Sequence, residues 1–189
     1  MREVIWRGRG GQGAFTASRL LGAAYSSIPA NYALAFPSFG PERRGAPMRA
    51  FTKLSKAKIG DRSTPAQGDF VVYLDDTLFG EGYEAELKPA GQVLLNSTKA
   101  VDDARVRTID ADGISRKVLG RAIPNTALLA ALTQMIPGFT RDSLQRAIRE
   151  YMPTRLHDKN LSVVDEVLRL MDGARGEAPA DAGLKGGGL

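Results

Sequence analysis

A glycine-rich turn between an apolar run and a helical pattern is the feature that most constrains the fold of this chain. The run Val4–Arg7 stops at Gly8, and Gly8, Gly10 and Gly13 satisfy the pattern G-x-G-x-x-G. Between residues 14 and 25, small and apolar side chains recur at the i, i+3, i+4 and i+7 spacing of one helix face. A strand, a glycine turn and a helix in this order predict the opening of a Rossmann-like βαβ unit.

Later apolar runs predict that the first strand belongs to a larger sheet. The run Phe70–Leu74 is apolar throughout, as in a strand buried on both faces. Three prolines between residues 33 and 47 fix the backbone and remove hydrogen-bond donors, so we expect an ordered loop there, not a helix or a central strand. Shorter runs predict further strands at residues 48–54, 93–95 and 106–109.

The pattern becomes helical in the last third of the chain. We expect Asn125 to cap one helix, Thr140 to cap the next, and Gly173 to end the last. The residues beyond are rich in glycine and alanine, which predicts flexibility. The expected fold is therefore α/β, a Rossmann-like sheet with flanking helices and a helical C-terminal part, over residues 1–172, followed by a flexible Gly/Ala-rich tail over residues 173–189.

The composition excludes several kinds of site. The 189 residues include no cysteine, which excludes disulfides, thiolate zinc sites, cysteine nucleophiles and protein-ligated iron–sulfur clusters in this chain. The single histidine, His157, excludes a histidine-rich metal site. We find no targeting segment and no apolar stretch of roughly 20 residues, so we expect a cytoplasmic chain. The net charge of +5 favours anionic partners, meaning nucleic acid, phosphorylated ligands or an acidic subunit.

The glycine turn predicts phosphate recognition. Glycines let the backbone approach a phosphate, and the following helix presents unpaired N–H groups at its N-terminus. A dinucleotide site would also need an acidic residue roughly 20 residues further on to hold the ribose hydroxyl. No Asp or Glu occurs between Val4 and Pro41, which weakens an NAD interpretation. The alternative without a ligand is tight packing of the strand on the helix.

A proline-stiffened loop, residues 36–47, carries the adjacent arginines Arg43 and Arg44. Stiff loops lose little entropy on binding, and arginine forks suit phosphate or carboxylate groups. One interpretation is therefore an anion-binding loop beside the glycine turn. The other is a subunit interface with Phe36 and Phe39 as buried anchors. The residues leave both interpretations open.

Other polar groups have structural as well as functional interpretations. Asp75 and Asp76 follow a predicted strand, where paired acids can hold a metal or act as a base, but they more often cap the following turn. His157 lies in a polar stretch before a helix, and we expect it at the surface or in a cap contact. A solvated helix face is expected for three basic residues, Arg116, Lys117 and Arg121.

Four segments together resemble one protein family. Residues 8–18 are similar to the N-terminal signature of the gamma subunit of 2-oxoacid:acceptor oxidoreductases, the superfamily of pyruvate:ferredoxin oxidoreductase. Residues 36–51 resemble the second signature of that family, and residues 123–129 and 159–160 resemble two later segments. The similarity extends from residue 2 to residue 172, in order and at family-like spacing.

The resemblance implies one subunit of a multisubunit enzyme. Such enzymes oxidatively decarboxylate a 2-oxoacid on thiamine diphosphate, pass electrons through iron–sulfur clusters to ferredoxin or NAD, and release an acyl-CoA. It implies that thiamine diphosphate, Mg and the clusters lie in alpha, beta and cluster-bearing delta-type subunits. This chain would hold no cofactor alone, and neither nucleic acid nor a membrane would be a partner. The absence of cysteine and of a Gly-Asp-Gly motif agrees with this.

The resemblance assigns contacts with coenzyme A (CoA), the implied co-substrate, or with phosphate to particular residues, and it assigns no catalytic or metal-binding residue. The candidates are Gly8, Gly10, Gly11, Gln12, Gly13, Thr16, Arg43 and Arg44. The implied substrate is pyruvate-like, branched-chain or aryl, such as phenylglyoxylate. Two alternatives stay open, a free-standing nucleotide-binding oxidoreductase and a purely structural scaffold subunit.

Overall fold

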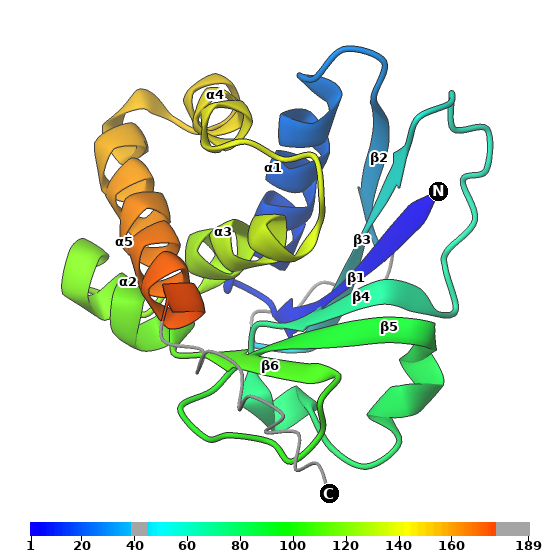
Figure 1. The fold of residues 1–189 in the computed structure, drawn as a ribbon, viewed down its shortest axis with the longest axis horizontal. Helices are drawn as coiled ribbons and strands as arrows, with labels where there is room; N and C mark the ends of the chain where they lie inside the picture. The colour runs from blue at the N-terminus through cyan, green and yellow to red at the C-terminus, as the bar shows by residue number, and fades with distance from the viewer. Residues whose placement is uncertain (39–44, 177–189) are drawn as a thin grey trace, which may run out of the picture.

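A computed structural model describes residues 1–38 and 45–176 of the chain. They form a six-stranded sheet in the order β2-β3-β1-β4-β5-β6 (Figure 1). Inside the sheet, β1 is parallel to β4 and antiparallel to β3, and β5 and β6 continue the parallel part. The strands are β1 (Arg2–Arg9), β2 (Tyr32–Pro37), β3 (Pro47–Ser55), β4 (Gly68–Tyr73), β5 (Leu87–Asn96) and β6 (Val106–Ile109).

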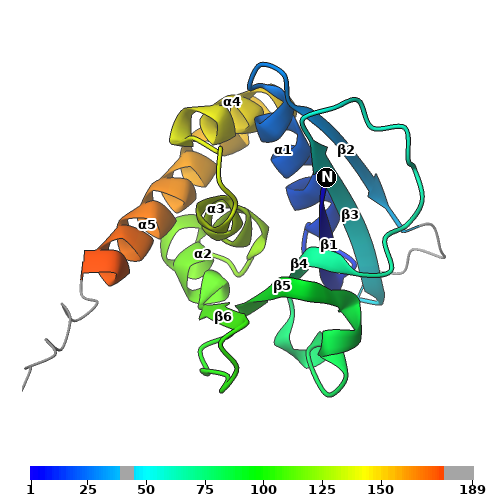
Figure 2. The ribbon, with the colours of Figure 1, turned by 45° about the vertical axis from the view of Figure 1, so that its right-hand side comes forward.

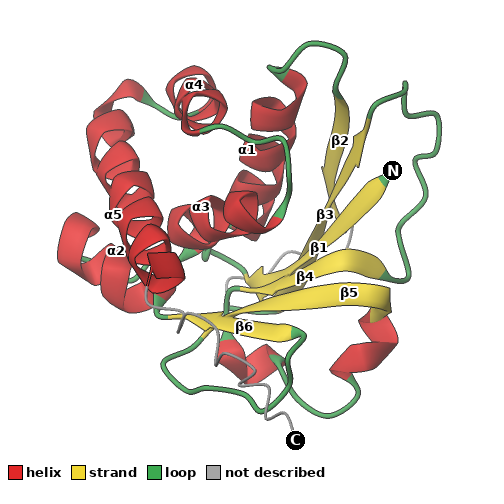
Figure 3. Ribbon diagram, viewed as in Figure 1, coloured by secondary structure: helices red, strands yellow, loops and turns green. Residues whose placement is uncertain are grey.

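The α-helices of the described residues pack on one face of the sheet (Figures 1 and 2). They are α1 (Ala14–Ser26), α2 (Ala111–Leu119), α3 (Asn125–Met135), α4 (Arg141–Tyr151) and α5 (His157–Gly176). The opposite face carries two short 3-10 helices, η1 (Asp76–Leu78) and η2 (Tyr83–Glu86) (Figure 3). A third, η3 (Thr154–Leu156), precedes α5.

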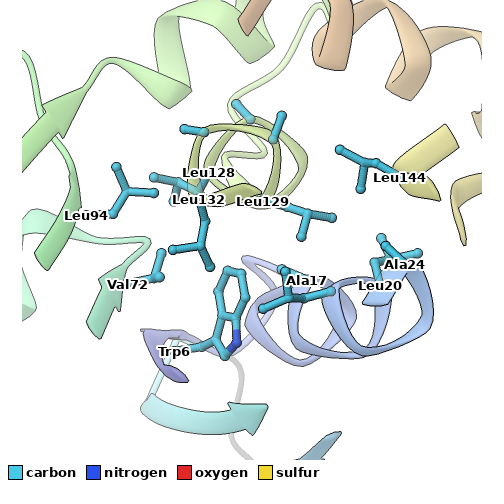
Figure 4. Packing of buried hydrophobic residues seen from close by; sticks show 14 of the residues in the cluster. Trp6, Ala17, Leu20, Ala24, Val72, Leu94, Leu128, Leu129, Leu132 and Leu144 are labelled. Atoms are coloured by element: carbon cyan, nitrogen blue, oxygen red, sulfur yellow. The ribbon is translucent and has the colours of Figure 1, made fainter. Parts of the chain in front are cut away.

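The larger core lies between the sheet and the helices. Side chains of a strand alternate between the two faces of a sheet, so Val4 and Trp6 enter this core while Ile5 packs on the opposite face. Trp6 is fully buried, and its indole N–H donates to Thr52 Oγ1 at 3.0 Å. Figure 4 shows Trp6 between the sheet and leucines of α3, with Ala17 of α1 beside it. This packing holds α1 and α3 against one face of the sheet.

The expected α/β architecture is confirmed. The predicted βαβ unit is present, but a further strand, β3, is inserted between its two strands. β2 follows α1 and runs in the same direction as β1, but the antiparallel strand β3 lies between them. The predicted helix after the glycine turn is α1. The predicted cap at Thr140 is also present, because its side chain accepts a hydrogen bond from the Ser143 N–H in a capping box.

Three sequence predictions were wrong in detail. Residues 33–37 form the edge strand β2 instead of a loop, and an edge tolerates Pro37 because one side of the strand needs no ladder bond. Pro124, not Asn125, occupies the N-cap of α3, and no side-chain cap bond is made there. The last helix, α5, does not end at Gly173 but continues to Gly176.

Candidate functional site

The glycine turn begins at the carboxyl end of β1, in the middle of the sheet. From β1 the chain passes to β2 and β3 on one side, whereas β4, β5 and β6 lie on the other side. Open α/β sheets bind ligands at such a topological switch point. The backbone of Gly10 is joined to the segment before β3, since its N–H donates to the Ala46 carbonyl at 2.9 Å and its carbonyl accepts from Gly45 N–H at 3.1 Å.

The Gln12 side chain fixes the shape of the turn. Its Oε1 accepts from the Arg9 backbone N–H at 2.7 Å, and its Nε2 donates to Asp75 Oδ2 at 2.9 Å. Arg9 Nε donates to the same Asp75 oxygen at 3.1 Å. Asp75 is also the N-cap of η1 and accepts from the Thr77 N–H at 3.0 Å, which confirms the capping expectation.

Asp75 is ionised in this arrangement. Desolvation acts to raise its pKa, but the hydrogen bonds from Thr77 and Gln12, together with the charge of Arg9, outweigh desolvation and lower the pKa of Asp75 below its usual value. The carboxylate therefore ties the glycine turn to the end of β4. Gln12, a predicted phosphate contact, has its amide oxygen and amide nitrogen bonded within the protein.

Two glycines of the turn have backbone conformations that other residues rarely adopt. Gly11 has φ 98° and is exposed, and a Cβ added to it would meet no atom within 4 Å. Gly13 has φ 84° and is the N-cap of α1, where a Cβ would lie 2.5 Å from Asn125 Nδ2. Gly11 thus leaves the backbone open to a ligand, while Gly13 lets α3 approach α1 closely.

An acidic hollow of about 240 Å³ lies on one side of the turn, at the carboxyl ends of the parallel strands. Four aspartates and one arginine contribute its charges: Asp75, Asp76, Asp110, Asp112 and Arg116. Gln12 also lines it. This is the position where a doubly wound fold would hold a diphosphate, and the excess of carboxylates opposes such an anion. The geometry therefore adds to the sequence argument against an NAD site.

A basic hollow of about 780 Å³ lies on the other side, among the helices. Thr16 in the first turn of α1 lines it, and so does Asn125, which packs on Gly13. Its charged lining residues are Arg19, Arg121, Arg155 and Lys159, and no carboxylate lines it. The two hollows therefore differ in charge: the first is rich in carboxylates, and the charged lining residues of the second are all cations.

Two segments that carry the family resemblance meet at the basic hollow. Thr126 Oγ1 donates to Asn160 Oδ1 at 2.7 Å, and Asn160 Nδ2 donates to the Leu156 carbonyl at 2.8 Å. Thr126 and Asn160 are both buried. This contact joins the start of α3 to the start of α5, 34 residues apart in the chain. Two segments that each resemble the family, and that are far apart in the sequence, thus build one wall of the hollow.

The structure separates the predicted site residues into three groups. Gly8, Gly10, Gln12 and Gly13 are engaged within the protein, while Gly11 is exposed and Thr16 lines the basic hollow. Arg43, Arg44 and Phe39 lie outside the described residues. Phe36 packs on Phe51 with ring centroids 5.4 Å apart.

Sequence reasoning missed most of the basic hollow. Arg121 was expected on a solvated helix face, but it follows α2 and lines the hollow. Arg19, Tyr151 and Arg155 come from separate segments with no local motif, so only their assembly in the fold reveals them. His157 accords with the expected cap contact, since its Nε2 lies 2.7 Å from the Met152 carbonyl oxygen.

Neither a metal centre nor a membrane span is visible in the described part of the chain. Over residues 1–38 and 45–176, no three His, Asp or Glu side chains gather in a way that could hold a metal ion. In the same ranges, no helix is both long and apolar enough to cross a membrane. Among the features that these residues offer for binding are the glycine turn and the two hollows.

Comparison with known proteins shows the class to which this fold and site belong. Residues 3–170 match the family model described as pyruvate ferredoxin/flavodoxin oxidoreductase. This match covers nearly all of the described α/β domain. The chain belongs to the pyruvate ferredoxin/flavodoxin oxidoreductase family.

Within this family the chain is a gamma-type subunit. It is 42% identical over 163 residues to pyruvate synthase subunit PorC of Methanothermobacter marburgensis, covering 85% of this chain and 92% of the relative. It is 36% identical over 176 residues to the pyruvate/ketoisovalerate oxidoreductases common subunit gamma of Thermococcus kodakarensis, covering 88% and 95%. The expectation of an oxidoreductase subunit that is not the catalytic core is confirmed.

A solved structure supports the same assignment at the level of the fold. The crystal structure of pyruvate oxidoreductase subunit PORC from Thermotoga maritima superposes with a TM-score of 0.75 at 30% sequence identity. The match covers 89% of this chain and 95% of that one. The six-stranded sheet with its helices is therefore the fold of a gamma-type subunit.

Proposed function

We propose that this chain works in the cytoplasm within a complex that converts a 2-oxoacid and CoA to acyl-CoA and CO₂. Its partners would be alpha, beta and cluster-bearing delta-type subunits, which would hold thiamine diphosphate, Mg and the iron–sulfur clusters. The absence of cysteine supports this division, because no cluster can be ligated by this chain. The names of the relatives favour pyruvate or a branched-chain 2-oxoacid as the substrate and ferredoxin as the acceptor.

The contribution of this chain is to bind and orient CoA. The observation that carries this proposal is the open backbone at Gly11, next to the N-terminus of α1, which has no side-chain cap. Free N–H groups at a helix N-terminus favour a phosphate group. Thr16 in the first helical turn adds a hydroxyl, and Arg43 and Arg44 add charge. Thiamine diphosphate would supply the decarboxylation in the partner subunits, and this chain would hold CoA so that its thiol reaches them.

A purely structural role is the second candidate, and internal bonding of the turn favours it. Gly10 and Gln12 both use their backbone N–H groups within the protein, and the side-chain amide of Gln12 is bonded at both ends. A scaffold subunit would need the turn only to join β1, β3 and β4. The two roles differ in their effect on CoA kinetics.

The apparent KM for CoA in the assembled complex distinguishes the two roles. With Arg43→Ala and Arg44→Ala combined, we expect this KM to rise about tenfold, since charged hydrogen bonds contribute about 1.5–3 kcal/mol each and part is screened by solvent. The KM for the 2-oxoacid should stay unchanged. An unchanged KM for CoA would show that the two arginines do not contact CoA. If the variant assembles poorly with its partner subunits while the KM for CoA stays normal, the scaffold role is favoured.

A further inference from the structure

Asp75 is bonded to both ends of the glycine turn and lies on the side of the acidic hollow. Its Oδ2 accepts from Gln12 Nε2 at 2.9 Å and from Arg9 Nε at 3.1 Å, and its Oδ1 accepts from the Thr77 N–H at 3.0 Å. The side chain is 14% exposed, and of the two hollows it lines the acidic one. A carboxylate in this position repels an anion near the turn, so any favourable contribution to anion binding must come through its hydrogen bonds.

Residues 9–12 form a tight turn that is closed by two hydrogen bonds between the same two residues. Gln12 N–H donates to the Arg9 carbonyl at 3.0 Å, and Arg9 N–H donates to Gln12 Oε1 at 2.7 Å. Gly11 is the third residue of this turn, and its φ of 98° is in the positive range that a type II turn requires there. The side chains of Arg9 and Gln12 are both bonded to Asp75, and we call these two bonds the Asp75 clasp. The clasp holds the two residues that close the turn.

The peptide between Gly10 and Gly11 has a fixed orientation. The Gly10 carbonyl accepts from the Gly45 N–H at 3.1 Å, and Arg9 Nη1 donates to the Gly45 carbonyl at 3.3 Å. The C=O and N–H of a trans peptide point in opposite directions, so the Gly11 N–H points away from Gly45. Among the residues that the structure describes, this N–H has no hydrogen-bond acceptor, and Gly11 is exposed. The turn therefore presents one oriented donor for a ligand.

We propose that Asp75 is a positioning residue for CoA binding. Through Arg9 and Gln12 it keeps the turn in the shape that leaves the Gly11 N–H available to an anionic group of CoA. This inference rests on the proposed function, because it takes CoA as the ligand of the turn. Without the clasp the Gly10–Gly11 peptide is free to rotate, and the Gly10 carbonyl, an acceptor, then faces the anion. A donor that is oriented before binding avoids this cost.

The sign of the change in the apparent KM for CoA tests the positioning role in the assembled complex. Asp75→Asn removes a negative charge, which by electrostatics alone would lower this KM. The new amide nitrogen faces a donor whichever way the amide turns, either Gln12 Nε2 or the Thr77 N–H, so a bond of the clasp or of the cap is lost. We expect the KM for CoA to rise about fivefold, the effect of one net hydrogen bond. The kcat at saturating CoA and the KM for the 2-oxoacid should stay unchanged.

Two further variants separate positioning from charge and from folding. Asp110→Asn removes the same charge from the same acidic hollow, but Asp110 caps α2, so the KM for CoA should stay within about twofold. Asp75→Asn/Gln12→Glu restores a donor–acceptor pair between the two side chains, and the KM should return toward that of the wild type. If Asp75→Asn does not assemble, Thr77→Val gives the same test with a smaller rise, because it removes a hydroxyl that bonds Asp75 and Arg9.

The outcomes distinguish a failure of the positioning role from a failure of the proposed function. If the KM for CoA falls or stays unchanged in Asp75→Asn while it rises in the Arg43/Arg44 variant, the positioning role is wrong and the proposed function stands. If neither variant changes this KM, both are wrong. A rise that Asp110→Asn reproduces, or that the added Gln12→Glu does not reverse, reflects a general effect of charge or stability and also overturns the positioning role.

Discussion

At the residue scale, the glycine turn combines a ligand-accessible backbone with side chains committed to holding its shape. The sequence identified the turn and its glycines correctly, because the G-x-G-x-x-G spacing is local. The hydrogen bond between Gln12 and Asp75 could not be predicted from the sequence. These residues are 63 positions apart and meet only when β1 and β4 pair. Local motifs therefore predicted where the glycine turn lies better than they predicted which of its atoms are free.

The Gln12–Asp75 contact can be tested by an isosteric change. Gln12→Glu keeps the acceptor for Arg9 N–H but replaces the donor to Asp75 with a carboxylate oxygen. We expect a loss of about 2 kcal/mol in the free energy of unfolding, measured by urea denaturation at pH 7. In an Asp75→Asn background the same change should cost clearly less, because two carboxylates no longer face each other. Equal costs in both backgrounds would show that the contact is absent.

The two positive-φ glycines should differ in their tolerance of a methyl group. Alanine in a left-handed conformation costs about 1–2 kcal/mol, and Gly11→Ala should lose only this because the space around it is open. Gly13→Ala should lose more, since its Cβ would lie 2.5 Å from Asn125 Nδ2. Denaturant unfolding measures both, and an added Asn125→Ala should reduce the excess cost of Gly13→Ala. Similar costs at the two positions would contradict the close approach of α3.

At the element scale, the sequence predicted most strands and helices but not how α3 and α5 meet. Continuous apolar runs and helical periodicity are local signals and were sufficient for β4 and α1. β2 was missed because Pro37 within it and the two prolines after it favour a loop, and its place at the sheet edge is a tertiary property. The basic hollow was missed for the same reason, since its lining residues come from several separate helices and the segments between them.

The buried bond between Thr126 and Asn160 should stabilise the junction of α3 and α5. Thr126→Val keeps the shape but leaves Asn160 Oδ1 without its 2.7 Å donor. An unsatisfied buried acceptor costs about 1–3 kcal/mol, so we expect a loss of this size in the free energy of unfolding. Thr133→Val is a suitable comparison, because its hydroxyl bonds only within α3 and the loss should be smaller. A neutral Thr126→Val would contradict the bond.

An ion-pair cluster between α2 and α5 should make stability depend on pH. Glu166 accepts hydrogen bonds from Arg169 and Lys117, which lower its pKa from 4.5 to about 2. A carboxylate with a lowered pKa stabilises the fold above its unfolded pKa, and this stabilisation is lost as pH falls from 4.5 through about 2. Wild type should therefore exceed Glu166→Gln in stability at pH 6, and the difference should vanish near pH 2. Thermal unfolding of both proteins between pH 2 and pH 6 measures this difference in stability. A difference that does not change with pH would contradict the lowered pKa of Glu166.

At the scale of the whole molecule, charge is sorted on either side of the glycine turn. Carboxylates gather in the acidic hollow at the ends of the strands, and cations gather in the basic hollow among the helices. The net charge of +5 suggested an anionic partner but could not give its position, because a sum contains no geometry. The fold shows where cations gather, and the family match shows that the chain is a subunit of an oxidoreductase complex.

Purification of the tagged full chain from its native cells tests the central claim most directly. The chain should copurify with subunits that carry thiamine diphosphate and iron–sulfur clusters, identified by mass spectrometry and cofactor analysis. The purified complex should reduce ferredoxin with a 2-oxoacid only when CoA is present. Recovery of the chain as a free monomer, without thiamine- or cluster-bearing partners and without CoA-dependent activity in the fraction, would contradict the account.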